Sequence, residues 1–157
     1  MKNTVKGLLL AIVTTGTFAV AEPDGWFNRP NVVRAADTLA QEVESFDTAL
    51  HKVTAPDHII QKVHHFEETV TAFAEDVRKM PYQEAVHEMI HIREDVETLR
   101  QELSAHSQLL QNPAIDTEWR HVRSAYRNLD HQMFQSGGIN HDAEMKREMA
   151  EIEAAHQ

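Results

Sequence analysis

The chain has 157 residues, with 25 acidic side chains against 15 basic ones, 11 His and no Cys. Without Cys it cannot form a disulfide, an iron–sulfur cluster or a thiolate zinc site. The net charge of −10 argues against a nucleic-acid partner, because phosphate contacts need clustered Lys and Arg. Five Gly and five Pro are few for a collagen-like or turn-rich β protein, so we expect a helical domain.

Residues 1–21 have the pattern of a secretory signal peptide. Two Lys precede an apolar run over residues 8–20, and Ala19-Val20-Ala21 is the small-x-small pattern that signal peptidases cleave. The run is shorter than the roughly 20 residues that a membrane-spanning helix needs. We therefore expect cleavage after Ala21, a periplasmic or secreted protein, and no membrane span in the mature chain. The alternative is an uncleaved N-terminal anchor.

Apolar residues recur with a 4-3-4-3-4 spacing in four segments of the chain. This spacing is typical of helices that each bury one stripe against their neighbours. The repeated positions are Val32, Ala36, Leu39, Val43, Phe46, Leu50; Ile59, Val63, Phe66, Val70, Phe73, Val77; Ala85, Met89, Ile92, Val96, Leu99, Leu103; and Ile115, Trp119, Val122, Tyr126, Leu129, Met133.

Proline stands where each of these helices is expected to begin, since the first turn of a helix leaves its N–H groups unpaired. The four prolines are Pro30, Pro56, Pro81 and Pro113. Asn112, just before the last of them, is a favoured N-cap type. The pattern predicts helices over residues 31–54, 57–79, 82–110 and 113–135.

Short links between the segments favour antiparallel neighbours. The predicted fold class is all-α, with an up-down-up-down antiparallel four-helix bundle over residues 31–135 built from a fourfold helical repeat. We expect residues 22–30 to form an N-terminal extension and residues 136–157 an acidic C-terminal tail or a short amphipathic helix.

The segment from His87 to His91 matches H-E-x-x-H, the pattern in which two His hold a zinc ion and Glu88 is the general base of a hydrolase. The run lacks the G-x-x-H continuation. Met89 belongs to the apolar stripe, so both His are expected to point outward. A zinc hydrolase therefore remains only a remote alternative.

Glu84, His87 and His91 share one surface of the predicted third helix, because they are spaced at i,i+3 and i,i+4. Imidazole and carboxylate ligands suit Zn²⁺, Cu²⁺ and Ni²⁺. These three residues form the first candidate metal site. The alternative is a solvated polar face whose His have no ligand.

His51, His58 and His106 fall near one end of the predicted bundle, and His106 takes an inward-facing position of the extended pattern. They form the second candidate metal site. The alternative for His106 is a hydrogen-bonded histidine at the end of the bundle.

We find no nucleophile motif and no Gly-rich phosphate loop, so we do not expect an enzyme. The expected function is that of an exported, non-enzymatic interaction module that binds an envelope protein. The alternative is a periplasmic protein that binds Zn²⁺, Cu²⁺ or Ni²⁺ through Glu84, His87 and His91 and acts as a metal buffer or sensor. The sequence leaves the partner, the ion and the oligomeric state open.

Overall fold

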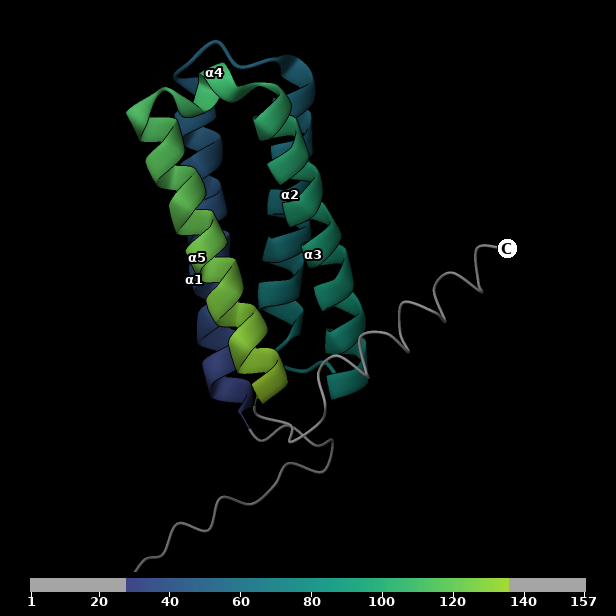
Figure 1. Ribbon diagram of the computed structural model, residues 1–157. Coiled ribbons are helices and arrows are strands. Elements are labelled where there is room, and N and C mark those ends of the chain that lie inside the picture. The colour runs from purple at the N-terminus through teal and green to yellow at the C-terminus, as the bar shows by residue number, and fades with distance from the viewer. Residues whose placement is uncertain (1–27, 136–157) are drawn as a thin grey trace, which may run out of the picture.

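The computed structural model describes residues 28–135, and this part of the chain is helical with no strand. The elements are α1 (Arg29–His51), α2 (Asp57–Asp76), α3 (Tyr82–Ala105), α4 (Ser107–Leu110) and α5 (Pro113–Gln135). The four long helices lie lengthwise beside one another, and α4 lies at the same end of the molecule as the α1–α2 link (Figure 1). None of the described helices is long and apolar enough to cross a membrane.

The predicted signal peptide, most of the predicted extension and the predicted C-terminal tail lie outside the described residues. Inside them, the predicted helix starts are close to the observed ones. Each long helix begins at or beside one of the four prolines. The Asn112 side chain acts as the expected N-cap of α5, since its Oδ1 accepts a hydrogen bond from the Ala114 N–H at 3.0 Å. Helices α1 and α2 end at His51 and Asp76, earlier than predicted.

The prediction of one helix over residues 82–110 is wrong, because His106 separates α3 from α4. His106 has φ −113° and ψ 50°, outside the helical range. Its Nδ1 lies 3.0 Å from the Glu102 carbonyl oxygen, which also accepts the His106 N–H. This local bonding supports a helix end at His106, and apolar periodicity does not signal it.

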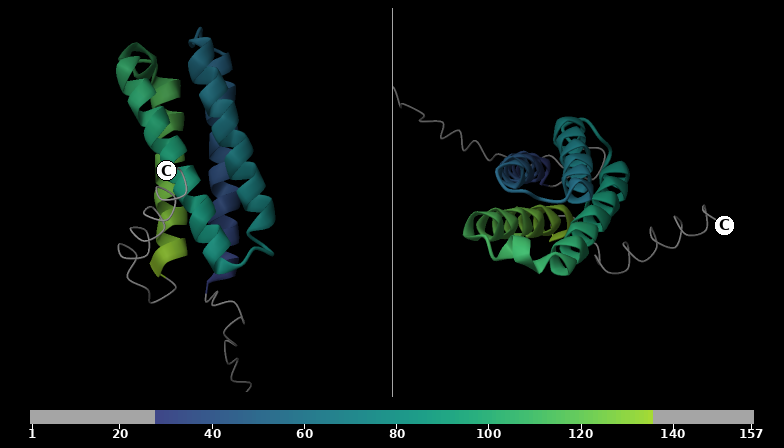
Figure 2. Two further views of the ribbon diagram at one scale, coloured as in Figure 1. Left: turned by 90° about the vertical axis from the view of Figure 1, so that its right-hand side faces the viewer. Right: turned by 90° about the horizontal axis from the view of Figure 1, so that it is seen from above.

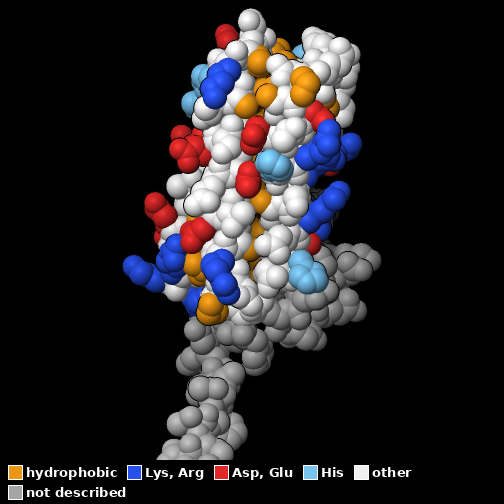
Figure 3. All heavy atoms as spheres, turned by 90° about the vertical axis from the view of Figure 1, so that its left-hand side faces the viewer, with side chains coloured by type: hydrophobic (Ala, Val, Ile, Leu, Met, Phe, Trp, Pro, Cys, Tyr) orange, Lys and Arg blue, Asp and Glu red, His pale blue; other side chains and the backbone are white. Residues whose placement is uncertain are grey.

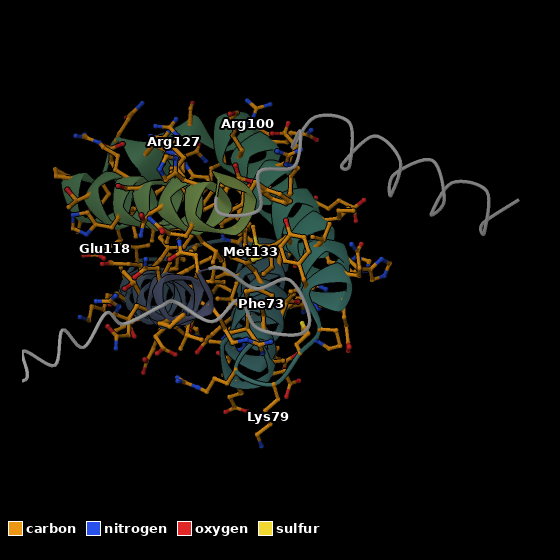
Figure 4. All side chains as sticks on the ribbon, turned by 90° about the horizontal axis from the view of Figure 1, so that it is seen from below. Phe73, Lys79, Arg100, Glu118, Arg127 and Met133 are labelled. Carbon is orange, nitrogen blue, oxygen red and sulfur yellow. The ribbon has the colours of Figure 1, made fainter. Side chains whose placement is uncertain are left out.

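The repeated apolar positions form the core. All of them are buried except Val96 and Tyr126, which are partly buried. Seen from below, Phe73 and Met133 lie between the helices, whereas Lys79 extends outward (Figure 4). Burying a large apolar side chain contributes about 1.5–3 kcal/mol, so this stripe is the main stabilising term.

The helices do not contact one another equally. α1 packs closely against both α5 and α2, and α2 packs against α3, whereas α3 approaches α5 at few positions. The side and top views show α1 beside both α2 and α5, and α3 lies diagonally across from α1 (Figure 2). The backbone of α1 therefore approaches its neighbours over more of its length than that of α3 approaches α5.

Candidate metal centre

The two histidines of the H-E-x-x-H run lie against each other on α3. Their Nε2 atoms are 3.3 Å apart, and their rings meet edge to face with centroids 4.9 Å apart. Two nitrogen ligands of one tetrahedral zinc ion are about 3.3 Å apart, because each Zn–N bond is about 2.0–2.1 Å. The same contact also suits one N–H···N hydrogen bond between neutral rings. His87 and His91 therefore present two ligands at a distance that one ion could bridge.

No third ligand joins this pair within residues 28–135. Glu84 is exposed and does not complete, with His87 and His91, a group whose ligand atoms all lie within 4.8 Å of one another. Glu94 approaches the other ring nitrogen, with its Oε2 3.7 Å from the His91 Nδ1. Met89 is buried, and the His91 side chain is 45% exposed, as expected for an outward-facing pair. The site of Glu84, His87 and His91 stays a prediction.

The histidines of the second predicted site are divided between two clusters. His58 and His106 come together, with ring centroids 5.0 Å apart. His51 instead lies beside His64, with ring centroids 5.5 Å apart. In each cluster a carboxylate completes a group of three residues whose ligand atoms all lie within 4.8 Å of one another.

The first of these, the α1–α2 cluster, consists of Asp47 and His51 on α1 and His64 on α2. The two imidazoles approach different oxygens of the same carboxylate. His51 Nδ1 is 3.3 Å from Asp47 Oδ2, and His64 Nε2 is 3.3 Å from Asp47 Oδ1. Asp47, His51 and His64 also line a groove of about 420 Å³ on the surface.

Negative charge in the α1–α2 cluster is poorly compensated. The Asp47 side chain is only 15% exposed, and its Oδ1 is buried without accepting a hydrogen bond. Burial raises the pKa of the neighbouring Glu67, and repulsion from Asp47 raises it further, whereas His64 lowers it. A buried carboxylate is costly unless a cation or hydrogen bonds compensate it. The two imidazoles are its ion-pair partners among the described residues.

The second, the α2–α3 cluster, consists of His58 on α2 with Glu102 and His106 at the end of α3. His58 Nε2 lies 3.4 Å from Glu102 Oε2. Lys62 pairs with the same carboxylate, its Nζ lying 3.4 Å from Glu102 Oε1. This cluster therefore already contains a permanent positive charge.

The third, the α1–α5 cluster, consists of Glu42, Glu118 and His121. His121 Nδ1 lies 3.6 Å from Glu42 Oε2 and 3.7 Å from Glu118 Oε2. Acidic and His side chains are neighbours on the face shown in Figure 3, among scattered hydrophobic ones. With one imidazole for two carboxylates, this group also suits a simple surface ion pair.

The second predicted site named His51, His58 and His106 and none of the carboxylates that join them. Asp47 and Glu102 each stand four residues before a His near the end of a long helix. This spacing places both side chains on one helix face, so it could have been found in the sequence. The match of His64 with Asp47 could not, because it depends on how α2 is rotated against α1.

Comparisons with known proteins assign no function. No protein-family model matches the chain. No curated protein and no solved structure matches it either. The geometry of the clusters is therefore what supports a function.

Proposed function

We propose that this chain is an exported protein that binds a divalent transition-metal ion, Zn²⁺, Cu²⁺ or Ni²⁺, through Asp47, His51 and His64. The observation that carries the proposal is the Asp47 carboxylate, which is largely buried between two imidazoles with one oxygen that accepts no hydrogen bond. A bound cation would supply the compensation that Lys, Arg and backbone N–H groups do not.

The scaffold that we propose is an up-down-up-down antiparallel four-helix bundle built from the fourfold repeat. The buried stripes and the contacts of α1 with α2 and α5, and of α2 with α3, support it. Export rests on the signal-peptide pattern of residues 1–21. Binding to an envelope protein stays a prediction.

The ligand set favours a transition metal over a hard cation. Two imidazoles and one carboxylate suit Zn²⁺, Cu²⁺ and Ni²⁺, whereas Ca²⁺ and Mg²⁺ prefer oxygen ligands throughout. Three protein ligands leave at least one coordination position to water. The groove of about 420 Å³ beside the cluster gives that water room.

The orientation of His51 also fits a ligand. Its Nδ1 lies 3.0 Å from the backbone carbonyl oxygen of Asp47, to which a protonated Nδ1 donates. A metal-bound imidazole commonly donates its other N–H to a carbonyl or carboxylate, which fixes the tautomer and the ring orientation. With Nδ1 protonated, Nε2 is the His51 nitrogen whose lone pair is available to an ion.

Calorimetric titration of the full chain with Zn²⁺, Cu²⁺ and Ni²⁺ tests the proposal. We expect the tightest binding step to weaken by about tenfold or more in His51→Ala/His64→Ala, because two of three ligands are removed. His131→Ala, which removes an exposed imidazole outside the clusters, is the matched control and should leave the isotherm unchanged.

Two outcomes would contradict the proposal. One is an isotherm of the double variant that equals that of the unaltered chain for all three ions. The other is binding of Mg²⁺ as tight as that of Zn²⁺, since oxygen-only sites and not this cluster would then account for it.

A further inference from the structure

Helix α2 supplies an imidazole to each of two clusters that contain the same types of ligand. His64 meets Asp47 and His51 on α1, and His58 meets the acid and the His at the end of α3. In both clusters the acid and the His of the neighbouring helix are four residues apart. α2 thus shares one three-ligand group of two imidazoles and one carboxylate with each neighbour.

We propose that His58, Glu102 and His106 form a second site for the same class of divalent ion, and that Lys62 makes it the weaker of the two. This inference rests on the proposed function for the choice of ion alone, because the two ligand sets share no residue. A chain with both sites would retain one ion firmly and exchange the other.

The geometry of the second site resembles that of the first. His58 Nε2 is 3.4 Å from Glu102 Oε2, and the His58 and His106 rings have centroids 5.0 Å apart. His106 Nδ1 lies 3.0 Å from the Glu102 carbonyl oxygen, as His51 Nδ1 does from that of Asp47. In both clusters this bond orients the ring and leaves Nε2 available as a ligand.

The helix end between α3 and α4 helps to position the ligands of the second site. His106 is the residue at which α3 ends, with φ −113° and ψ 50°. Its N–H and its Nδ1 both face the Glu102 carbonyl oxygen, so the backbone bonding that ends the helix also holds the imidazole beside the carboxylate of the same residue. The helix end therefore places two of the three ligands, Glu102 and His106, side by side before an ion binds.

The two sites differ in the charges around their carboxylates. Lys62 Nζ lies 3.4 Å from Glu102 Oε1, so a cation that binds Glu102 must compete with this ammonium. Lys52 lines the groove beside Asp47 but forms no ion pair with it, and Glu67 adds negative charge there. Coulomb attraction therefore favours an ion beside Asp47 over one beside Glu102.

The exposed fractions of the two carboxylate side chains also favour tighter binding beside Asp47 than beside Glu102. The Glu102 side chain is 26% exposed, against 15% for Asp47, so water screens its charge more effectively. His58 and Lys62 line a groove of about 450 Å³ between α2 and α3, which continues to His65 and Asp95. Solvent and exchanging ligands can reach the second site from this groove.

Zn²⁺ titration of the full chain, followed by calorimetry and native mass spectrometry, tests the inference. We expect two ions per chain, bound in a tighter and a weaker step. His58→Ala/His106→Ala should abolish the weaker step and keep the tighter one. Glu102→Gln, which preserves the shape of the side chain, should weaken the same step by about tenfold or more.

Lys62→Met is the sharper variant, because it removes the ammonium while keeping a long apolar side chain. It should tighten the weaker step by about two- to fivefold, the range expected for one partly exposed charge pair. Lys79→Met, at an exposed lysine outside the clusters, is the matched control and should change neither step.

The inference is overturned by a single ion per chain, by a weaker step that survives in His58→Ala/His106→Ala, or by equal effects of Lys62→Met and Lys79→Met. If His51→Ala/His64→Ala leaves the affinity of the tighter step unchanged, the proposed function is contradicted. The result of the His58→Ala/His106→Ala experiment is still valid in that case. The two proposals therefore fail separately.

Discussion

A pair of buried aromatic rings joins α5 to α1, whereas a hydrogen bond and an ion pair join α5 to α3. Toward α1, the rings of Trp119 and Phe46 have centroids 5.6 Å apart, and both side chains are buried. Toward α3, the Arg93 Nε donates a hydrogen bond of 3.2 Å to the Tyr126 hydroxyl. Arg93 also pairs with Asp130 on α5 at 3.8 Å.

The two interfaces of α5 are stabilised by different kinds of interaction. Close packing between α1 and α5 removes apolar area from water, which is the larger source of stability. Between α3 and α5 the backbones approach at few positions, and the two repeated positions that remain partly exposed, Val96 and Tyr126, belong to these two helices. We infer that the α3–α5 interface is the weaker of the two.

The three clusters also lie between closely packed helices and not between α3 and α5. Within residues 28–135 they join α1 to α2, α2 to α3 and α1 to α5, and no such group joins α3 to α5. Side chains as short as Asp and His reach one another only where two helices pack closely. Close packing therefore creates both the core and the candidate metal ligands.

The largest expected effect is that of Phe46→Ala. This change removes a fully buried ring from the α1–α5 interface and should lower the free energy of unfolding by about 3–5 kcal/mol. Urea unfolding followed by circular dichroism measures it. Val96→Ala, at the partly exposed position of α3, should cost less than about 1 kcal/mol. Equal losses of unfolding free energy in Phe46→Ala and Val96→Ala would contradict the inference that the α3–α5 interface is the weaker one.

Tyr126→Phe tests the polar bridge and should have an intermediate effect. It removes the hydroxyl that accepts from Arg93 and should lower the free energy of unfolding by about 0.5–1.5 kcal/mol at neutral pH. The same urea experiment applies. A variant as stable as the unaltered chain would mean that the bridge adds nothing to this interface.

The contribution of Tyr126 should also depend on pH. Burial raises the pKa of its hydroxyl, whereas the bond from Arg93 opposes this rise and Asp130 adds to it. A raised pKa means that the fold favours the neutral phenol, so this stability is present below pH 10 and is lost as the pH rises through the folded pKa. Above pH 10 the unaltered chain should therefore lose its advantage over Tyr126→Phe. An unchanged difference in alkaline urea curves would contradict this.

The smallest effect is expected outside both interfaces. Glu97 and Arg100 pair on the exposed face of α3, and the hydrogen bond from Arg100 lowers the pKa of Glu97 to about 2. Any stability from this pair is present above the unfolded pKa of 4.5 and is lost as the pH falls toward 2. Arg100→Gln should leave neutral stability unchanged within error, because exposed pairs contribute little. NMR titration of the Glu97 carboxyl should show its pKa return toward 4.5, and a pKa that stays near 2 would contradict the assigned cause.

Much of the fold follows from local pattern. The positions of the 4-3-4-3-4 spacing are buried apart from Val96 and Tyr126, and the prolines locate the helix starts. The spacing misses other buried side chains, among them Val86, Ile90 and Phe134. The side-by-side arrangement of His87 and His91 also follows from spacing, since residues four apart lie on one face of a helix. The end of α3 at His106 does not, because apolar periodicity carries no signal for a bond between a His side chain and a backbone carbonyl.

The sequence by itself determined which stripe of each long helix faces the core, because a helix repeats every 3.6 residues whatever surrounds it. Only the tertiary structure decided that His64 meets Asp47, that His58 meets Glu102, and that Lys62 lies beside one carboxylate and not the other. Those pairings depend on the rotation and axial offset of α2 against α1 and α3. Packing of the whole apolar stripe sets both quantities, and no single stretch of sequence encodes them.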